Sequence, residues 1–181
     1  MSIEAQVKKF EDGGYITAGG KKISFEVLGE PYPAPMACHN ATFIWLYQAT
    51  HDGAFPPRKS LEVGQTQLFV DKLIKFGNPS RVTEKSLPLA GDVLLFANPD
   101  APTVALHSCV AINGGKTIAG YNQTGWFAGG LVDDYSEHAA DSIDWVKRAA
   151  IFTRRRATAA GADRYIWAVR EATAMGVMAK S

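Results

Sequence analysis

The sequence has few cysteines and no close cysteine pair. Only Cys38 and Cys109 occur among 181 residues, and they do not form a CxxC motif. A disulfide framework is therefore not expected in a chain of this size, while a single bridge between these two thiols stays an open alternative. Structural zinc ligands usually come as close pairs of Cys or His, so we expect no metal and no other cofactor.

Other absences narrow the possible functions. The chain has no GxSxG, no phosphate-binding glycine loop before a helix and no HExxH. No stretch is long enough to span a membrane, and residues 1–10 lack the apolar core of a secretory signal. The net charge of +1 gives no general attraction to nucleic acid. We expect a protein made in the cytoplasm, whose secretion would need a signal-independent route.

The composition is that of a globular protein, with 46% hydrophobic and 10% aromatic residues. The length predicts one domain over residues 1–181. Apolar periodicity and turn residues together predict an α+β fold, with helices early, an antiparallel sheet in the second half and a closing helix. Residues 2–11 are expected to form a short helix or an extended arm, and further helices are expected at a segment starting near Cys38, at 64–76 and at 163–178. The expected strands are a hairpin at 15–17 and 22–28, a meander at 93–97, 104–112 and 116–122, and a last strand at 149–152.

Cys38 lies at the start of one of these helices. Two prolines precede it, and then about a dozen residues follow without Gly or Pro. Cys38, Thr42 and Trp45 recur at helical spacing and so share one face. A thiol in a first helical turn feels the positive end of the helix dipole, which favours the thiolate. Cys38 is therefore the candidate nucleophile.

His107 is the one ionisable residue inside the apolar middle strand of the meander. A helix packed across a sheet can bring a first-turn thiol against a strand imidazole, which would take the thiol proton. A third polar group is then needed to orient the imidazole. Asn122 is the best candidate for that role, and Asn113 and Gln123 are weaker alternatives.

The order of these motifs resembles the papain-like hydrolases of the NlpC and CHAP type. The resemblance rests on the Cys38 helix, on Gly91-Asp92-Val93-Leu94-Leu95-Phe96, on the His107 strand and on the turn Asn113-Gly114-Gly115. It implies a papain-like core over about residues 35–153, with an extra N-terminal hairpin and C-terminal helix. The nucleophile helix would pack on an antiparallel sheet, with Cys38 and His107 as the catalytic pair.

The resemblance also implies a function. These families hydrolyse amide bonds, often in peptidoglycan peptides, and some members are effectors delivered into other cells. The expected activity is that of a cysteine peptidase or amidase, and an exported toxin would have an immunity or delivery partner. Tyr121, Trp126 and Cys109 are the candidate substrate contacts. Cys109 lies two residues beyond His107 and so shares a strand face with it, and we expect it to be a packing residue near the site.

Two other functions stay open. A protein deamidase or transglutaminase-like toxin would use the same thiol and imidazole on a glutamine side chain. A non-catalytic binding module on the same scaffold would leave the thiol unreactive, since a lone Cys on an apolar helix is commonly a core residue.

Overall fold

The computed structural model describes residues 1–12, 38–83, 86–98, 100–115, 117–120, 138–139 and 165–181. The expected N-terminal hairpin and the expected strand at 149–152 lie outside these residues. The helices are α1 (Ile3–Asp12), α2 (Cys38–Thr50), α3 (Val63–Phe76) and α5 (Glu171–Met178), with short 3-10 turns η2 (Arg58–Leu61) and η3 (Asn113–Gly115). The strands are β1 (Ser80–Arg81), β2 (Val93–Asn98), β3 (Ala101–Ile112), β4 (Thr117–Ala119), β5 (His138–Ala139) and β6 (Tyr165–Val169).

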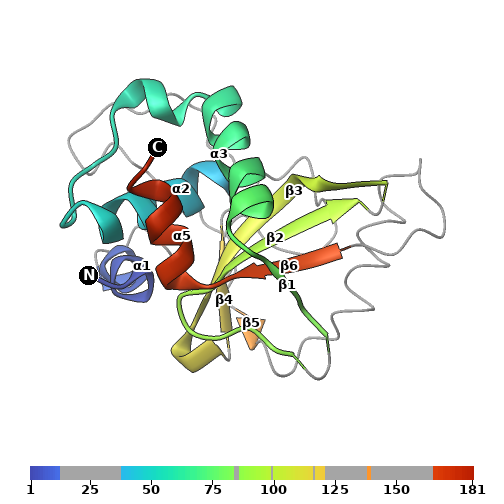
Figure 1. Ribbon diagram of the computed structural model, residues 1–181. Coiled ribbons are helices and arrows are strands. Elements are labelled where there is room, and N and C mark those ends of the chain that lie inside the picture. The colour runs from blue at the N-terminus through green and yellow to red at the C-terminus, as the bar shows by residue number, and fades with distance from the viewer. Residues whose placement is uncertain (13–37, 84–85, 99, 116, 121–137, 140–164) are drawn as a thin grey trace, which may run out of the picture.

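The strands form one antiparallel sheet in the order β1-β6-β2-β3-β4-β5 (Figure 1). The meander expected from the three apolar runs is confirmed as β2, β3 and β4. The expected helices 2–11 and 64–76 are confirmed as α1 and α3, within one residue at most ends. The protein is thus α+β in the part of the chain that the structure describes.

The C-terminal segment differs from its expected form. Residues 163–178 were predicted as one helix, but Tyr165–Val169 is strand β6 and only Glu171–Met178 is helical. Aromatic and β-branched residues dominate the first half of this segment, and such residues favour a pleated, half-buried surface. β6 fills the position between β1 and β2, where Trp167 lies opposite Leu95. The pairing with two neighbours therefore decides its structure, which local helical spacing does not reveal.

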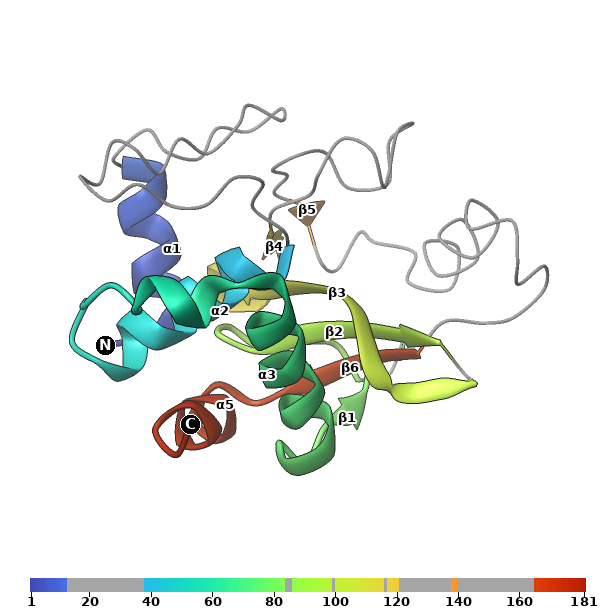
Figure 2. The ribbon, with the colours of Figure 1, turned by 90° about the horizontal axis from the view of Figure 1, so that it is seen from above.

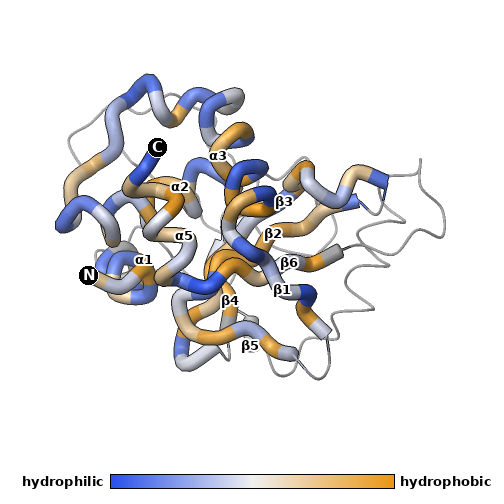
Figure 3. The backbone as a smooth tube through the Cα atoms, viewed as in Figure 1, coloured by the Kyte–Doolittle hydropathy of each residue, from blue (hydrophilic) through white to orange (hydrophobic). Residues whose placement is uncertain are grey.

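The four helices gather on one side of the sheet (Figure 2). One apolar cluster joins all of them to the inner sheet face, where Val93, Leu95 and Val110 are fully buried. A second cluster covers the other face and includes Leu94, Phe96, Cys109, Ala111 and Ile166. Both faces of the central strands are therefore buried, which explains why their sequences are continuous apolar runs, seen as the hydrophobic stretches of β2 and β3 in Figure 3.

Helix α2 is buried on nearly all sides. Ten of its residues are buried, from His39 to Ala49. It lies against β3, with α1, α3 and α5 as its other neighbours. A helix enclosed in this way must satisfy its polar side chains internally, because water does not reach them.

Gly91 lies in a turn before β2 and has a left-handed backbone conformation. Its φ is +80°, and a Cβ atom placed there would lie 2.6 Å from the Glu171 carboxyl carbon. We expect Gly91→Ala to lower the free energy of unfolding by about 1 kcal/mol or more, because both the left-handed conformation and the contact become unfavourable.

Gly176, inside α5, is the matched control. No atom lies within 4 Å of a Cβ built there. Gly176→Ala should raise stability, by up to about 1 kcal/mol, through helix propensity alone. Urea unfolding of both variants measures the difference, and equal stability changes at the two positions would contradict this account.

Candidate active site

Cys38 is the first residue of α2, as the sequence predicts. Its side chain is half-buried and its thiol is free. The first backbone N–H groups of a helix have no partner within the helix. The thiol therefore lies among backbone donors, and the amides of Ser108, His39 and Cys38 itself all act to lower its pKa.

The imidazole beside this thiol belongs to His39. Cys38 Sγ lies 3.7 Å from His39 Nδ1. The same nitrogen lies 2.9 Å from Ser108 Oγ on strand β3. His39 is 5% exposed, so its ring is enclosed between the helix and the sheet. A thiol and an imidazole are thus adjacent along the chain and in space.

Polar groups continue from His39 into the protein. The hydroxyl oxygens of Ser108 and Thr42 lie 3.0 Å apart, and both residues are fully buried. Asn40, also on the first turn of α2, donates to the Leu61 carbonyl over 2.6 Å. The start of α2 is therefore a buried polar cluster within an otherwise apolar helix.

A second group of polar contacts joins α3 to β3 near His39. Asp71 Oδ1 accepts from the Ala105 backbone N–H over 2.8 Å and from Gln67 Nε2 over 3.0 Å. Gln67 Nε2 also donates to the Ala105 carbonyl over 2.8 Å. The Ala105 carbonyl, the Asp71 carboxylate and the Gln67 side chain all favour a proton on His39.

Burial outweighs these partners for both members of the pair. It lowers the pKa of His39 to about 4, against the opposing effect of the Ala105 carbonyl, Asp71 and Gln67. It raises the pKa of the Cys38 thiol to about 11, against the opposing effect of three backbone amides. At neutral pH the resting site holds a thiol and a neutral imidazole, because desolvation disfavours each charged form.

His107 does not occupy the place expected for it. Side chains of consecutive strand residues point to opposite faces, and Ser108 points toward α2. His107 therefore faces the other side of the sheet, where its ring centroid lies 5.4 Å from that of Phe96. Cys38 and His107 share no hydrogen bond in the part of the chain that the structure describes. In the described residues, the imidazole next to the Cys38 thiol is therefore that of His39, while the His107 ring lies on the opposite face of the sheet.

Cys109 lies on the same face of the sheet as His107. It is buried among Leu94, Ala111 and Ile118. The expectation that it shares a strand face with His107 is met, and that face is the one turned away from the Ser108 hydroxyl. Asn113 lies in η3 with an exposed side chain. Asn122, Gln123, Tyr121 and Trp126 lie outside the described residues.

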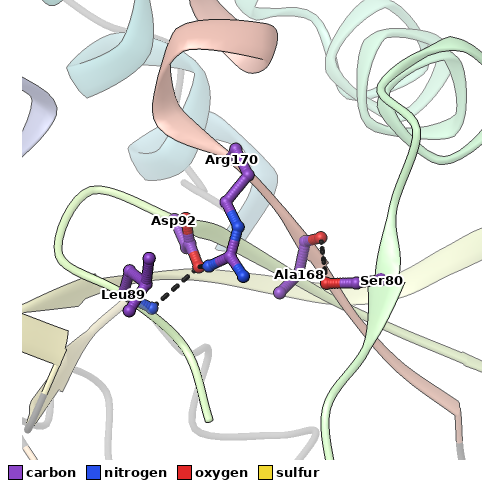
Figure 4. Close-up of polar contacts among 5 residues, drawn as sticks. All are labelled: Ser80, Leu89, Asp92, Ala168 and Arg170. Atoms are coloured by element: carbon purple, nitrogen blue, oxygen red, sulfur yellow. Dashed lines mark hydrogen bonds and ion pairs between the residues drawn. The ribbon is translucent and has the colours of Figure 1, made fainter. Parts of the chain in front are cut away.

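Asp92, the acid of the Gly-Asp motif, joins separate parts of the fold (Figure 4). Its Oδ2 accepts from the Leu89 backbone N–H over 2.8 Å and from the Arg170 guanidinium. Burial raises the pKa of Asp92, while the Leu89 amide and Arg170 oppose that rise. The motif therefore ties the entry of β2 to the turn between β6 and α5.

The sequence does not predict that the His39 ring lies beside the Cys38 thiol. The signal was present in Cys38-His39-Asn40 followed by Thr42, a run of polar residues at the start of an otherwise apolar helix. Polar residues on a buried helix must find partners, so such a run marks a site at which the helix end meets polar groups of its neighbours.

Within the described residues, no group of three or more His, Cys, Asp or Glu side chains is arranged to hold a metal ion. None of the helices found there is long and apolar enough to cross a membrane.

Comparison with known protein families, with curated proteins and with solved structures found no match.

The pKa of His39 predicts how stability depends on pH. Folding lowers the pKa of His39 from 6.5 to about 4, so the unfolded chain binds a proton more readily than the folded protein. The free energy of unfolding is therefore highest above pH 6.5 and falls as pH drops toward 4. The loss should approach about 3 kcal/mol below pH 4. His39→Asn should flatten this part of a pH series of urea unfolding. His51→Asn, at an exposed histidine, is the control, and an equal flattening in both variants would refute the assignment.

The pKa of Cys38 predicts slow alkylation of the free protein. A pKa of about 11, against an ordinary value of 9.0, makes the thiolate fraction at pH 7 about 100-fold smaller. In a Cys109→Ala background, where Cys38 is the remaining thiol, iodoacetamide should react about 100-fold more slowly than with a small-molecule thiol. Reaction at an equal or higher rate would show a stabilised thiolate instead.

Proposed function

We propose that this chain is a cysteine-dependent hydrolase of the papain-like, NlpC or CHAP type, in which Cys38 attacks an amide carbonyl. The observation that carries the proposal is the 3.7 Å approach of Cys38 Sγ to His39 Nδ1 at the start of a buried helix. The packing of that helix on an antiparallel sheet is the arrangement that the resemblance implies. A peptidoglycan peptide is the proposed substrate, on the strength of the resemblance alone.

The first step is attack with proton transfer. His39 Nδ1 takes the proton of the Cys38 thiol, and the sulfur electron pair forms a bond to the amide carbon. The backbone amides around the sulfur are donors for the oxyanion that develops on the carbonyl oxygen. The imidazolium then protonates the leaving amine, and water activated by the same imidazole hydrolyses the thioester.

Because both groups are neutral at rest, this chemistry is general-base catalysis rather than attack by a preformed thiolate. Activity should fall as pH drops through the His39 pKa of about 4, since a protonated imidazole cannot accept the thiol proton.

The test is incubation of the protein with purified peptidoglycan and, separately, with host-cell lysate, followed by mass spectrometry. Cys38→Ala should abolish all products. His39→Asn should lower the rate about 100-fold or more, because general acid–base catalysis contributes that much. His107→Gln is the matched comparison from the other sheet face, and a larger loss in that variant than in His39→Asn would return the base role to His107.

The same experiment separates the substrates. Cleaved peptide stems identify a peptidoglycan hydrolase, while a mass increase of one unit on a glutamine of a lysate protein, with release of ammonia, identifies a deamidase. No product that depends on Cys38 in either mixture would overturn the enzyme proposal.

A specific observation favours a second candidate function. The buried, neutral thiol and imidazole are also what a non-catalytic binding module would contain. For such a module Cys38→Ala should leave binding to insoluble peptidoglycan unchanged in a pull-down assay, while the products above stay absent.

A further inference from the structure

Three side chains form a continuous polar line behind the Cys38 thiol. His39 Nδ1 lies 2.9 Å from Ser108 Oγ, and Ser108 Oγ lies 3.0 Å from Thr42 Oγ1. Ser108 and Thr42 are both 0% exposed. The Nδ1 atom is also the one that faces Cys38 Sγ. The atom that would accept the thiol proton is therefore the atom already bound to a buried hydroxyl.

A hydroxyl has one proton to donate and lone pairs to accept with, so this line can be satisfied in two ways. In the first, the Ser108 hydroxyl donates to an unprotonated Nδ1. In the second, a protonated Nδ1 donates to Ser108 Oγ, and the Ser108 hydroxyl donates to Thr42 Oγ1. When Nδ1 gains a proton, rotation of the hydroxyls converts the first pattern into the second without movement of heavy atoms.

We propose that Ser108 and Thr42 are positioning residues of the Cys38–His39 pair, forming a two-hydroxyl relay whose hydrogen bonds reverse when Nδ1 takes the thiol proton. This inference rests on the proposed function. In the step, the S–H bond breaks, the proton forms an N–H bond at Nδ1, and the electron pair stays on sulfur for attack on the carbonyl carbon. The new Nδ1–H then donates to Ser108 Oγ.

The relay matters because water does not reach this part of the site. A buried imidazolium without an acceptor for its proton loses a charge-assisted hydrogen bond. The charged or titratable groups facing His39 are the Cys38 thiol from α2 and Asp71 from α3. From β3 it meets the neutral Ser108 hydroxyl and the Ala105 carbonyl. Ser108 is the partner that the structure places on the reacting nitrogen.

Three variants test the relay. Ser108→Ala removes the first hydroxyl, Thr42→Val removes the second and keeps a branched side chain, and Thr42→Ser restores the second. The readouts are the titration of the His39 ring by NMR and, with peptidoglycan as substrate, kcat, KM and the pH profile. Thermal unfolding and circular dichroism establish that each variant is folded.

Ser108→Ala should lower kcat about 10- to 100-fold with little change in KM, since a hydrogen bond to a charged group is lost. It should also move the His39 titration, and with it the acidic limb of the pH profile, to lower pH. Thr42→Val should move the His39 titration and the acidic limb to lower pH by a smaller amount than Ser108→Ala does. Thr42→Ser should restore the wild-type titration.

An unchanged His39 titration in folded Ser108→Ala would overturn the relay. So would a Thr42→Ser variant as impaired as Thr42→Val, because that result assigns Thr42 a packing role. If wild type and Cys38→Ala are equally inactive, the proposed function fails, while the NMR titrations still decide the relay on their own. If Ser108→Ala does not fold, the two Thr42 variants give the same decision.

Discussion

The enclosure of helix α2 is the constraint on which the rest of the structure depends. A helix that is buried from His39 to Ala49 must be apolar along most of its length, and Ala41, Ile44 and Trp45 meet that demand. The exceptions are concentrated in its first turn. Because their polar atoms cannot reach water, they require partners on α3, β3 and η2, and those partners are what make the helix start a chemically distinct place.

The face of the sheet to which each β3 residue points decides which partners are available to its side chain. Leu95 lies opposite Ser108 and Phe96 lies opposite His107, so the register with β2 fixes the face of each residue. A shift of one residue would exchange the two faces. The backbone of the Gly-Asp motif continues this pairing, because the Gly91 N–H donates to the Ala111 carbonyl over 2.8 Å and the Ala111 N–H donates to the Asp92 carbonyl over 2.9 Å. The Gly-Asp motif and the Ser108 hydroxyl are therefore linked through the sheet.

Much of the fold can be predicted from the sequence, but the face of the sheet to which each β3 residue points cannot. Cys38 opens a helix as its proline-preceded apolar run predicts, and the three apolar runs form β2, β3 and β4. In β3, however, every residue from His107 to Ile112 is buried, so both faces of this part of the strand are covered. Alternation of polar and apolar residues is the signal that assigns a face, and a strand buried on both sides lacks it. The same lack of polar and apolar alternation explains why the sequence predicts a helix for the residues that form β6.

The sequence favours His107 over His39 as the imidazole near Cys38, for a related reason. A histidine in an apolar strand stands out in a sequence, while a histidine next to a cysteine looks like an ordinary neighbour. Yet in the first turn of a helix adjacent side chains can both turn toward one strand, and here both the thiol and the imidazole meet Ser108.

The burial that brings these groups together also sets the order of the chemistry. A site that raises the thiol pKa and lowers the imidazole pKa disfavours an ion pair at rest. In the proposed hydrolysis, charge would separate only when a carbonyl receives the sulfur electron pair and the backbone amides stabilise the oxyanion. Under that proposal, the enclosed start of α2 would keep Cys38 unreactive toward general electrophiles and reactive toward a bound amide, a difference that an exposed thiolate cannot provide.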